Sequence, residues 1–332
     1  MGGIQVNKKY IIIGAIVVLI IGIFAFFKLK SPSLKSVLKE AKEAKSYILE
    51  TSMELMENDE LKSYQVNVTY LKKNKDYFKV ELYDKSLNQS QIIVRNDDGV
   101  FVLTPTLNQA FKFQSEWPLN SPKPYIYQSL LDFLEKGEVE KKKDGYLVNG
   151  KITYENDDRV ASQEVKFNKD LKPLYVNVFD KEGAEIMKLK ISSFKLNANV
   201  KEDSFNEEKI MKSSQNQYSN VSSSLPLYPV ALMGSTLQKE EVSTIDQTTN
   251  HILQFGGNKS FTLIEKTMSK NKQMNVDEIN AEMIDLIDGF AYQEGNQMIY
   301  VSSGVVCSLY SNDLNQKEML SVLSSMQSAS IK

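Results

Sequence analysis

Residues 99–118 read GVFVLTPTLNQAFKFQSEWP, and this stretch predicts two β-strands joined by a tight turn. Phe101 and Leu103 alternate with other residues before the turn, and Phe111 and Phe113 alternate after it. A period of two is typical of strands that bury one face. The stretch closes on Trp117, the only tryptophan in the chain. It predicts an antiparallel sheet whose apolar face either packs as a core or lines a cavity.

The same alternation extends outward over residues 64–196. Turn signals such as Asp97-Asp98-Gly99, Asp144-Gly145 and Glu182-Gly183 separate the apolar runs. About ten short strands in succession predict an antiparallel meander that curls into a sheet or partial barrel. The predicted strands lie near 64–70, 78–82, 91–95, 99–104, 110–115, 138–141, 146–154, 160–168, 174–179 and 185–196, with a short helix at 125–135.

A helical pattern precedes the strands. Between Pro32 and Asn58-Asp59, apolar and small residues recur every three or four positions: Leu34, Val37, Leu38, Ala41, Ile48, Ser52 and Leu55. This spacing predicts one long amphipathic helix that needs a partner surface. If it crosses the concave face of the sheet, the result is a solid core or a lined cavity, depending on the fit of the side chains.

The second half is predicted to be a smaller α+β domain. Residues 201–224 are polar and serine-rich, which is typical of a linker. Beyond it we expect strands at 251–255, 260–266, 298–302 and 304–310 and a helix at 315–327. The predicted fold class is therefore α+β, mainly antiparallel β, with one domain at 33–200, a linker at 201–224 and a second domain at 225–332.

The N-terminus carries a predicted transmembrane helix. Residues 10–27 form an uncharged run of 18 residues. As a helix, such a run is roughly 27 Å long, enough to cross a bilayer core. The alternative is a cleaved signal peptide, whose apolar region is usually shorter. We expect an uncleaved anchor after a short cytoplasmic tail at 1–9. Lysines after the segment favour a cytoplasmic C-terminus, but long following domains often translocate regardless of charge.

The composition argues against several classes of function. A net charge of −2 gives no basic surface for nucleic acid. A single cysteine, Cys307, and a single histidine, His251, exclude an intrachain disulfide and a zinc site of Cys and His pairs. Both are expected to be structural residues of strands. FGGNKSF, at 255–261, lacks the first glycine of a phosphate-binding loop. We therefore predict a non-enzymatic protein without catalytic residues, metal or cofactor.

The candidate binding residues are apolar. They are predicted to line a cavity or to form the core of the first domain, and core packing is the commoner fate of such residues. They are Leu38, Ile48, Val66, Val68, Phe101, Leu103, Phe111, Phe113 and Trp117.

The predicted order of helix and meander, together with DDGVFVLTPTLNQAFKFQ at 97–114, resembles the LolA-like superfamily of lipoprotein-binding domains. The resemblance covers about residues 34–210 and rests on the acidic-Gly turn, the Pro-containing turn and the apolar strands around them. The C-terminal stretch, with FGGNKSFTLIE at 255–265, resembles a module that accompanies such domains in sporulation proteins. Together the parts are similar to the GerS-like group of sporulation and germination proteins.

This resemblance implies an unclosed β-barrel with helices on its concave face, located outside the cytoplasmic membrane of a spore former. It implies a non-catalytic, membrane-tethered protein that binds or activates a cell-envelope enzyme, with a cortex peptidoglycan amidase as the expected partner. The alternative is a lipid or lipoprotein acyl-chain carrier. Some relatives are anchored through an N-terminal cysteine, which this chain lacks. A third interpretation, an anti-sigma regulator, would need a longer cytoplasmic segment than the nine residues before the anchor.

Overall fold

The computed structural model describes residues 33–57, 60–118, 122–154, 156–214, 225–245, 248–268, 271–287, 289–302 and 304–328. The chain divides into two units, Met1–Glu43 and Ala44–Lys332. In the first unit, helix α2 (Leu34–Lys42) begins at Ser33, whose side chain accepts a hydrogen bond from the Ser36 backbone N–H. The predicted transmembrane segment at 10–27 lies outside the described residues. Among the residues that are described, no helix is long and apolar enough to span a membrane.

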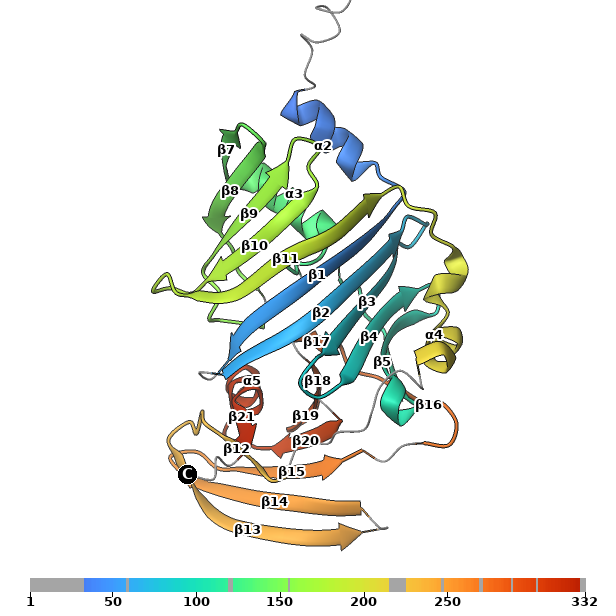
Figure 1. Ribbon diagram of the computed structural model, residues 1–332. Coiled ribbons are helices and arrows are strands. Elements are labelled where there is room, and N and C mark those ends of the chain that lie inside the picture. The colour runs from blue at the N-terminus through green and yellow to red at the C-terminus, as the bar shows by residue number, and fades with distance from the viewer. Residues whose placement is uncertain are drawn as a thin grey trace, which may run out of the picture. The chain divides into compact units, whose positions relative to one another are not determined.

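A curved 12-stranded sheet dominates the second unit within its described part (Figure 1). Its spatial order is β16-β6-β5-β4-β3-β2-β1-β11-β10-β9-β8-β7, antiparallel except at the β16–β6 pair. The strands are β1 (Ser46–Glu57), β2 (Glu60–Leu71), β3 (Tyr77–Asp84), β4 (Gln89–Asn96), β5 (Gly99–Thr104), β6 (Gln109–Phe113), β7 (Glu138–Lys142), β8 (Gly145–Lys151), β9 (Ser162–Asn168), β10 (Pro173–Phe179), β11 (Glu185–Leu196) and β16 (Asn275–Ile279). The predicted antiparallel sheet is confirmed, but it is not one continuous meander: β1 joins the run β2–β6 to the run β7–β11, so β6 and β7 do not pair with each other.

The long helix predicted to reach residue 57 is wrong beyond Lys42. β1 starts at Ser46 and pairs with both β2 and β11 in the middle of the sheet. Its alternate residues Tyr47, Leu49, Thr51, Met53 and Leu55 are fully buried. Ile48, Ser52 and Leu55 satisfy a helical spacing by coincidence, and pairing on both edges favours the strand, because tertiary contacts override local pattern.

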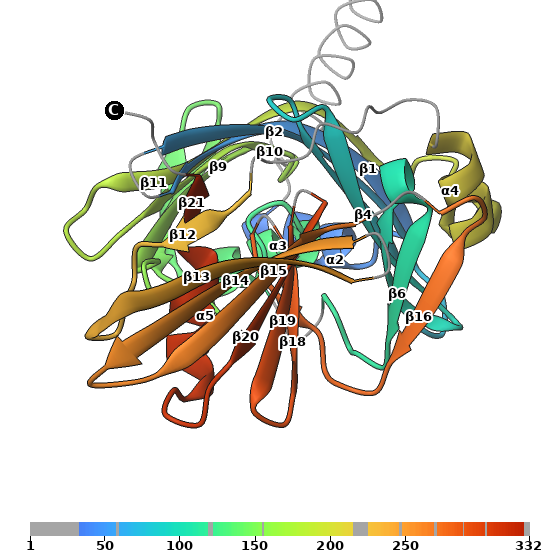
Figure 2. The ribbon, with the colours of Figure 1, turned by 90° about the horizontal axis from the view of Figure 1, so that it is seen from below.

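The inner face of the sheet is covered by a helix and by the loop before it. Helix α3 (Tyr127–Lys136) lies inside the curve of the sheet (Figure 2). Its apolar side chains Leu130, Leu131 and Leu134 are buried, as is Trp117 in the preceding loop. α3 therefore covers the face on which the resemblance implies helices, whereas the long helix expected to cross it does not form, since residues 46–57 are β1.

The turn in the opening stretch has a special backbone. Pro105–Leu107 forms one 3₁₀ turn, η1, which ends at Asn108 in the left-handed conformation at φ 54°. Asn108 also holds the distant segment that leads into β16: its amide donates to the Asn271 carbonyl at 2.6 Å, and its own carbonyl accepts from the Asn275 N–H at 2.8 Å. The turn therefore docks an edge strand contributed by the second half of the chain.

Residues 202–214, predicted as part of a linker, are folded. They form the 3₁₀ turn η2 (Glu202–Phe205) and helix α4 (Glu207–Ser214). Phe205, Ile210 and Met211 are buried in a cluster with residues of β4 and β5. These three apolar side chains explain why so polar a segment packs on the sheet.

A 7-stranded antiparallel sheet forms most of the described second half, in the order β13-β14-β15-β20-β19-β18-β17. Its strands are β13 (Ser235–Ile245), β14 (Thr248–Gly257), β15 (Phe261–Thr267), β17 (Ile284–Asp285), β18 (Phe290–Glu294), β19 (Gln297–Ser302) and β20 (Val305–Tyr310). A short pair, β12 (Leu227–Pro229) with β21 (Met326–Ser328), and helix α5 (Gln316–Ser324) complete it. The predicted domain boundaries stay a prediction. β16, which lies in the predicted second domain, pairs with β6 of the first sheet.

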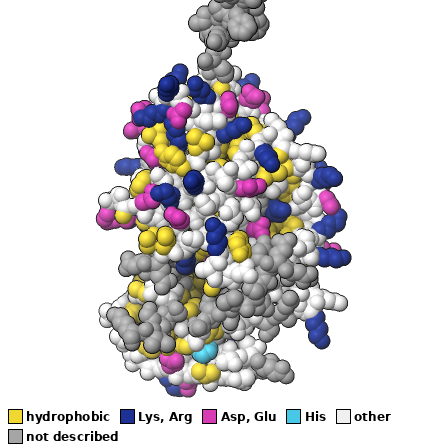
Figure 3. Space-filling view, viewed as in Figure 1, with side chains coloured by type: hydrophobic (Ala, Val, Ile, Leu, Met, Phe, Trp, Pro, Cys, Tyr) yellow, Lys and Arg dark blue, Asp and Glu magenta, His cyan; other side chains and the backbone are white. Residues whose placement is uncertain are grey.

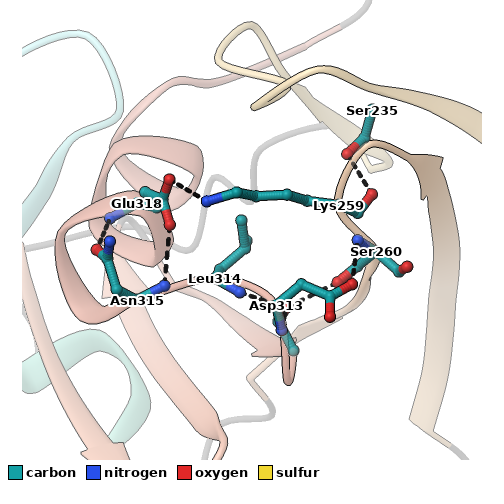
Figure 4. A network of polar contacts seen from close by, with 8 residues as sticks. Ser235, Lys259, Ser260, Asp313, Leu314, Asn315 and Glu318 are labelled. Carbon is teal, nitrogen blue, oxygen red and sulfur yellow. Dashed lines mark hydrogen bonds and ion pairs between the residues drawn. The ribbon is translucent and has the colours of Figure 1, made fainter.

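A polar network fixes the start of α5 to the loop between β14 and β15 (Figure 4). Asn315 and Glu318 form a capping box, in which each side chain accepts a backbone N–H of the other residue. Lys259 pairs with Glu318, and the Ser260 N–H donates to Asp313 at 2.8 Å. Lys259, in the stretch that superficially resembles a phosphate loop, is thus engaged by a carboxylate.

We expect Asn315→Ala to lower the free energy of unfolding by about 1 kcal/mol, because the cap side chain satisfies a backbone N–H that the helix leaves open. Thermal denaturation should show a decrease in Tm of about 2–4 °C. Gln316→Ala, at the exposed next position, serves as the control and should leave Tm unchanged. Equal Tm values for the two variants would show that the cap contributes nothing.

Candidate functional site

The nine candidate binding residues lie on different faces of the structure. Val66, Val68, Phe111, Phe113 and Trp117 are buried on the inner side of the first sheet. Phe101 and Leu103 point to the opposite face, into the cluster beneath α4. Ile48 is half-buried and alternates with the inward Tyr47 on β1, and Leu38 is half-buried on α2 in the other unit. The nine residues therefore do not form one common lining.

Aromatic rings fill much of the inner face. Tyr47 stacks on Tyr70 with centroids 5.1 Å apart and meets Tyr127 of α3 edge-on at 5.6 Å. Phe78 meets Trp117 at 6.4 Å. Such ring contacts are typical of a packed core. The assignment of an apolar ligand to this face stays a prediction.

A cleft of about 720 Å³ opens between one end of the first sheet and helix α5. Ligand sites in proteins usually lie in this range of volume. Six segments far apart in the sequence line it: Lys123 before α3, the residues 154 and 156–159, the residues 180–182 with Ile186, the residues 230–231 after β12, the β17 region at 285–287, and α5 with Ser325. The lining includes Lys123, Tyr154, Asn156, Asp157, Asp158, Arg159, Lys181, Ile186, Val230, Asp285, Leu286, Lys317, Leu320 and Ser324.

The floor of the cleft holds a buried ion pair. Lys123 Nζ lies 3.1 Å from Asp285 Oδ2, and the two side chains are 3% and 2% exposed. The Trp117 indole N–H donates to the same carboxylate oxygen at 2.6 Å. Burial of two charges is tolerated only with good pairing and further hydrogen bonds. The pair thus joins the loop on the inner face of the first sheet to β17 of the second.

The rim of the cleft carries charges of both signs and an exposed aliphatic side chain. Arg159 forms a two-point contact with Asp157, at 2.9 and 2.7 Å. Lys317 lies 3.8 Å from Asp158, and both side chains are more than 70% exposed. Val230, also on the rim, is 59% exposed. Such a mixture of apolar contact and polar rim is typical of protein–protein interfaces.

An exposed apolar pair adjoins this rim. Met56 and Leu61 face each other at the end of the β1–β2 hairpin, and they are 39% and 60% exposed. The Arg159 guanidinium donates to the Met56 carbonyl at 3.4 Å. Val230 and the hairpin-end pair therefore each expose apolar surface near the cleft. The outer face of the first sheet shows interspersed basic, acidic and hydrophobic side chains (Figure 3).

The two charged residues on the floor of the cleft were not predicted from the sequence. Lys123 lies between Pro122 and Pro124, and Asp285 lies in the apolar run MIDLIDGF at 283–290. A charged residue in such an apolar run has to be paired if it is buried. That was the available signal, but it does not reveal the partner, which is 162 positions away along the chain.

The only histidine and cysteine of the sequence flank one buried carboxyl group. Glu265 on β15 pairs across the sheet with His251 on β14 and with Cys307 on β20. Glu265 is fully buried, and its Oε2 accepts a hydrogen bond from the Leu227 N–H at 2.8 Å. Burial raises the pKa of Glu265 to about 7, with a smaller contribution from Glu240. Burial also raises the pKa of the Cys307 thiol, which favours the protonated form of a core residue.

We expect Glu265→Gln to stabilise the protein at pH 8 by roughly 3 kcal/mol and to have little effect at pH 4. The carboxyl group keeps its proton in the folded state up to a pKa of about 7, whereas in the unfolded chain it loses it from about 4.5. Folding stability therefore falls as pH rises between these values and then stays level. The glutamine removes this penalty and retains an oxygen for the Leu227 N–H.

Urea unfolding at pH 4 and pH 8 measures this effect. Glu278→Gln is the matched control, because its side chain is 74% exposed. It should change stability by less than about 0.5 kcal/mol at either pH. If the Glu265→Gln variant shows the same pH dependence as the wild type, then Glu265 ionises normally in the folded protein.

No group of three or more His, Cys, Asp or Glu suited to a metal occurs in the described part of the chain. The cleft offers hydrogen bonds, paired charges and apolar contacts, which are the elements of recognition. No family model matches the chain.

Over 304 residues, the chain is 32% identical to the sporulation protein YdcC of Bacillus subtilis, and the match covers 89% of each protein. The chain belongs to the YdcC family of sporulation proteins. The expected link to sporulation is thereby confirmed. Among solved structures, this YdcC-family chain is similar to the MucA/MucB complex of Pseudomonas aeruginosa, with 14% identity, a TM-score of 0.31 and coverage of 88% of this chain and 96% of that one. It is also similar to the LolA superfamily protein NE2245 of Nitrosomonas europaea, with 12% identity, a TM-score of 0.29 and coverage of 54% and 100%.

Proposed function

We propose that this YdcC-family chain is a non-catalytic, membrane-tethered binding protein of sporulation or germination. It holds the cleft outside the cytoplasmic membrane and docks a cell-envelope enzyme there. The observation that carries the proposal is the cleft of about 720 Å³ with an exposed aliphatic and charged rim. Membership of a sporulation family supports the process, and the predicted anchor at 10–27 supports the location.

A protein partner fits this site better than a lipid does. An acyl chain needs a continuous apolar lining, but the cleft contains Lys123, Asp285 and the paired charges of its rim. The inner face of the first sheet, where a carrier would hold its cargo, is packed with rings of the sheet, α3 and the Trp117 loop. The partner we propose is a cortex peptidoglycan amidase, whose activity or placement the docking would control.

The test measures binding between the full chain in lipid nanodiscs and the peptidoglycan amidases encoded in the same genome. We expect one of them to form a complex that Val230→Asp weakens by at least about tenfold, because a charge replaces an apolar contact in the interface. Val139→Asp is the matched control, since Val139 is 40% exposed on β7 and does not line the cleft. Equal loss for both variants, or no complex with any amidase, would contradict the proposal. A bound lipid of discrete mass in native mass spectrometry would favour the carrier instead.

A further inference from the structure

The floor of the cleft presents an unused hydrogen-bond donor. An ammonium group carries three N–H donors. Lys123 Nζ donates to the Asp285 carbonyl at 3.4 Å and forms an ion pair with Asp285 Oδ2 at 3.1 Å. No further acceptor for its N–H groups occurs among the described residues, although the side chain is 3% exposed. Because Lys123 lines the cleft, this donor is available to a molecule bound there.

An unused acceptor lies beside it. The Asn156 amide nitrogen donates to the Asp285 carbonyl at 3.4 Å, the same oxygen that Lys123 contacts at the same distance. Asn156 also lines the cleft, and its side-chain oxygen accepts no hydrogen bond from any residue that the structure describes. One donor and one acceptor are thus held around a single carbonyl oxygen.

The charge of the floor selects for an uncharged ligand group. Lys123 and Asp285 neutralise each other, so a carboxylate or ammonium placed next to them would be buried without a counter-charge. Burial of an ion without a counter-charge is strongly unfavourable. An amide has no net charge and carries one acceptor and one donor. It matches both unused groups.

We propose that the floor of the cleft recognises a backbone amide of an extended polypeptide segment, with Lys123 donating to its carbonyl and Asn156 accepting its N–H. This inference rests on the proposed function and names the chemistry by which the partner is held. The walls favour a polypeptide, because aliphatic residues (Ile186, Leu286 and Leu320) and ion-paired charges of both signs surround the floor. These suit the varied side chains that flank an amide in a protein segment.

The indole NMR signal of Trp117 can report ligand binding at the floor of the cleft. Trp117 is the only tryptophan, and its indole N–H donates to Asp285 on the floor, so the full ¹⁵N-labelled chain gives one indole NMR signal that reports on this point. The probes are N-acetyl-leucine-N′-methylamide, which is neutral and has two amides, N-acetyl-leucine, which ends in a carboxylate, leucine-N-methylamide, which carries an ammonium, and N-acetylglucosamine. We expect the neutral diamide to shift the signal saturably and each charged analogue to bind at least about fivefold more weakly.

Substitution of Asn156 tests whether its side chain contacts the diamide. Asn156→Ala should weaken the diamide about fivefold, since one hydrogen bond to an uncharged group is lost. Asn67→Ala, on the half-exposed outer face of β2, is the matched control and should leave binding unchanged. Asn156 is half-exposed, so its replacement leaves the buried pair and the fold in place.

Three outcomes would overturn the inference: equal or tighter binding of a charged analogue, a response to N-acetylglucosamine alone, or no response to any probe. The second would assign the floor to a glycan. If the indole signal does not shift with any probe, but an amidase binds and Val230→Asp abolishes that binding, then the proposed function holds and the amide site is wrong. If the diamide shifts the signal saturably but no amidase forms a complex, then the amide site holds and the proposed function is wrong.

Discussion

Replacing Phe113 with Asp is expected to unfold the first sheet. Phe113 is fully buried: its ring meets Phe290 at 5.7 Å and Tyr292 at 5.8 Å, and its accessible fraction is 0%. Removing such a ring costs about 3–5 kcal/mol, and burying a carboxylate there adds several more. The sum reaches the total stability of a typical domain, about 5–15 kcal/mol.

Circular dichroism and thermal denaturation of purified protein measure the outcome, and recovery in the soluble fraction gives a second readout. Phe179→Asp is the matched control, because Phe179 is half-buried at the end of β10. It should remain folded with a small decrease in Tm. A Phe113→Asp protein that melts like the wild type would mean that the inner face is loosely filled. The carrier hypothesis would then regain support.

The same residue shows how much of the fold can be predicted from the sequence. The alternation around Phe111 and Phe113 places their strand and its buried face correctly, because a period of two follows from strand geometry. What covers that face could not be predicted. Phe290 comes from β18, more than 170 positions further along the chain, and its local pattern carries no information about this contact.

Ambiguous periodicity accounts for the main error. In residues 46–57, apolar side chains fit both a helical stripe and a strand, and the choice depends on neighbours. β1 lies between β2 and β11 and pairs with both. Its pairing with β11 joins residues far apart in the sequence. Similarly, spacing alone groups Phe101 and Leu103 with Phe111 and Phe113. They lie on the opposite face because the turn at Pro105–Leu107 and Asn108 sets the register of the hairpin.

The cleft could not be predicted from the sequence, because it also depends on contacts between distant segments. Its lining comes from loops and from α5, and each residue has an ordinary polar or apolar neighbourhood along the chain. Only the three-dimensional arrangement brings Lys123, Asn156 and Asp285 to one carbonyl oxygen. A buried charge is the part of such a site whose loss has the largest effect on stability.

Lys123→Met is expected to cost about 3–5 kcal/mol, because it removes the cation of a buried ion pair while the Asp285 carboxylate stays buried. Asp285→Asn in the same chain should recover at least about 2 kcal/mol of this loss, since the amide is neutral and retains an oxygen for the Trp117 indole N–H. The free energy of unfolding from urea titrations of the wild type, both single variants and the double variant gives the coupling energy. Trp117 fluorescence follows the local environment in the same titrations.

Lys188→Met provides the comparison for an exposed pair. Lys188 lies 3.4 Å from Glu185, and the two side chains are 53% and 38% exposed. Such pairs contribute at most about 1 kcal/mol, because water screens the charges and the side chains lose freedom on pairing. If Lys123→Met costs no more than Lys188→Met, then water reaches the floor of the cleft and screens Asp285. The floor would then not reject charged ligand groups, since that selectivity depends on the same exclusion of water. A large coupling energy would instead show that the floor is dry and preorganised before any partner binds.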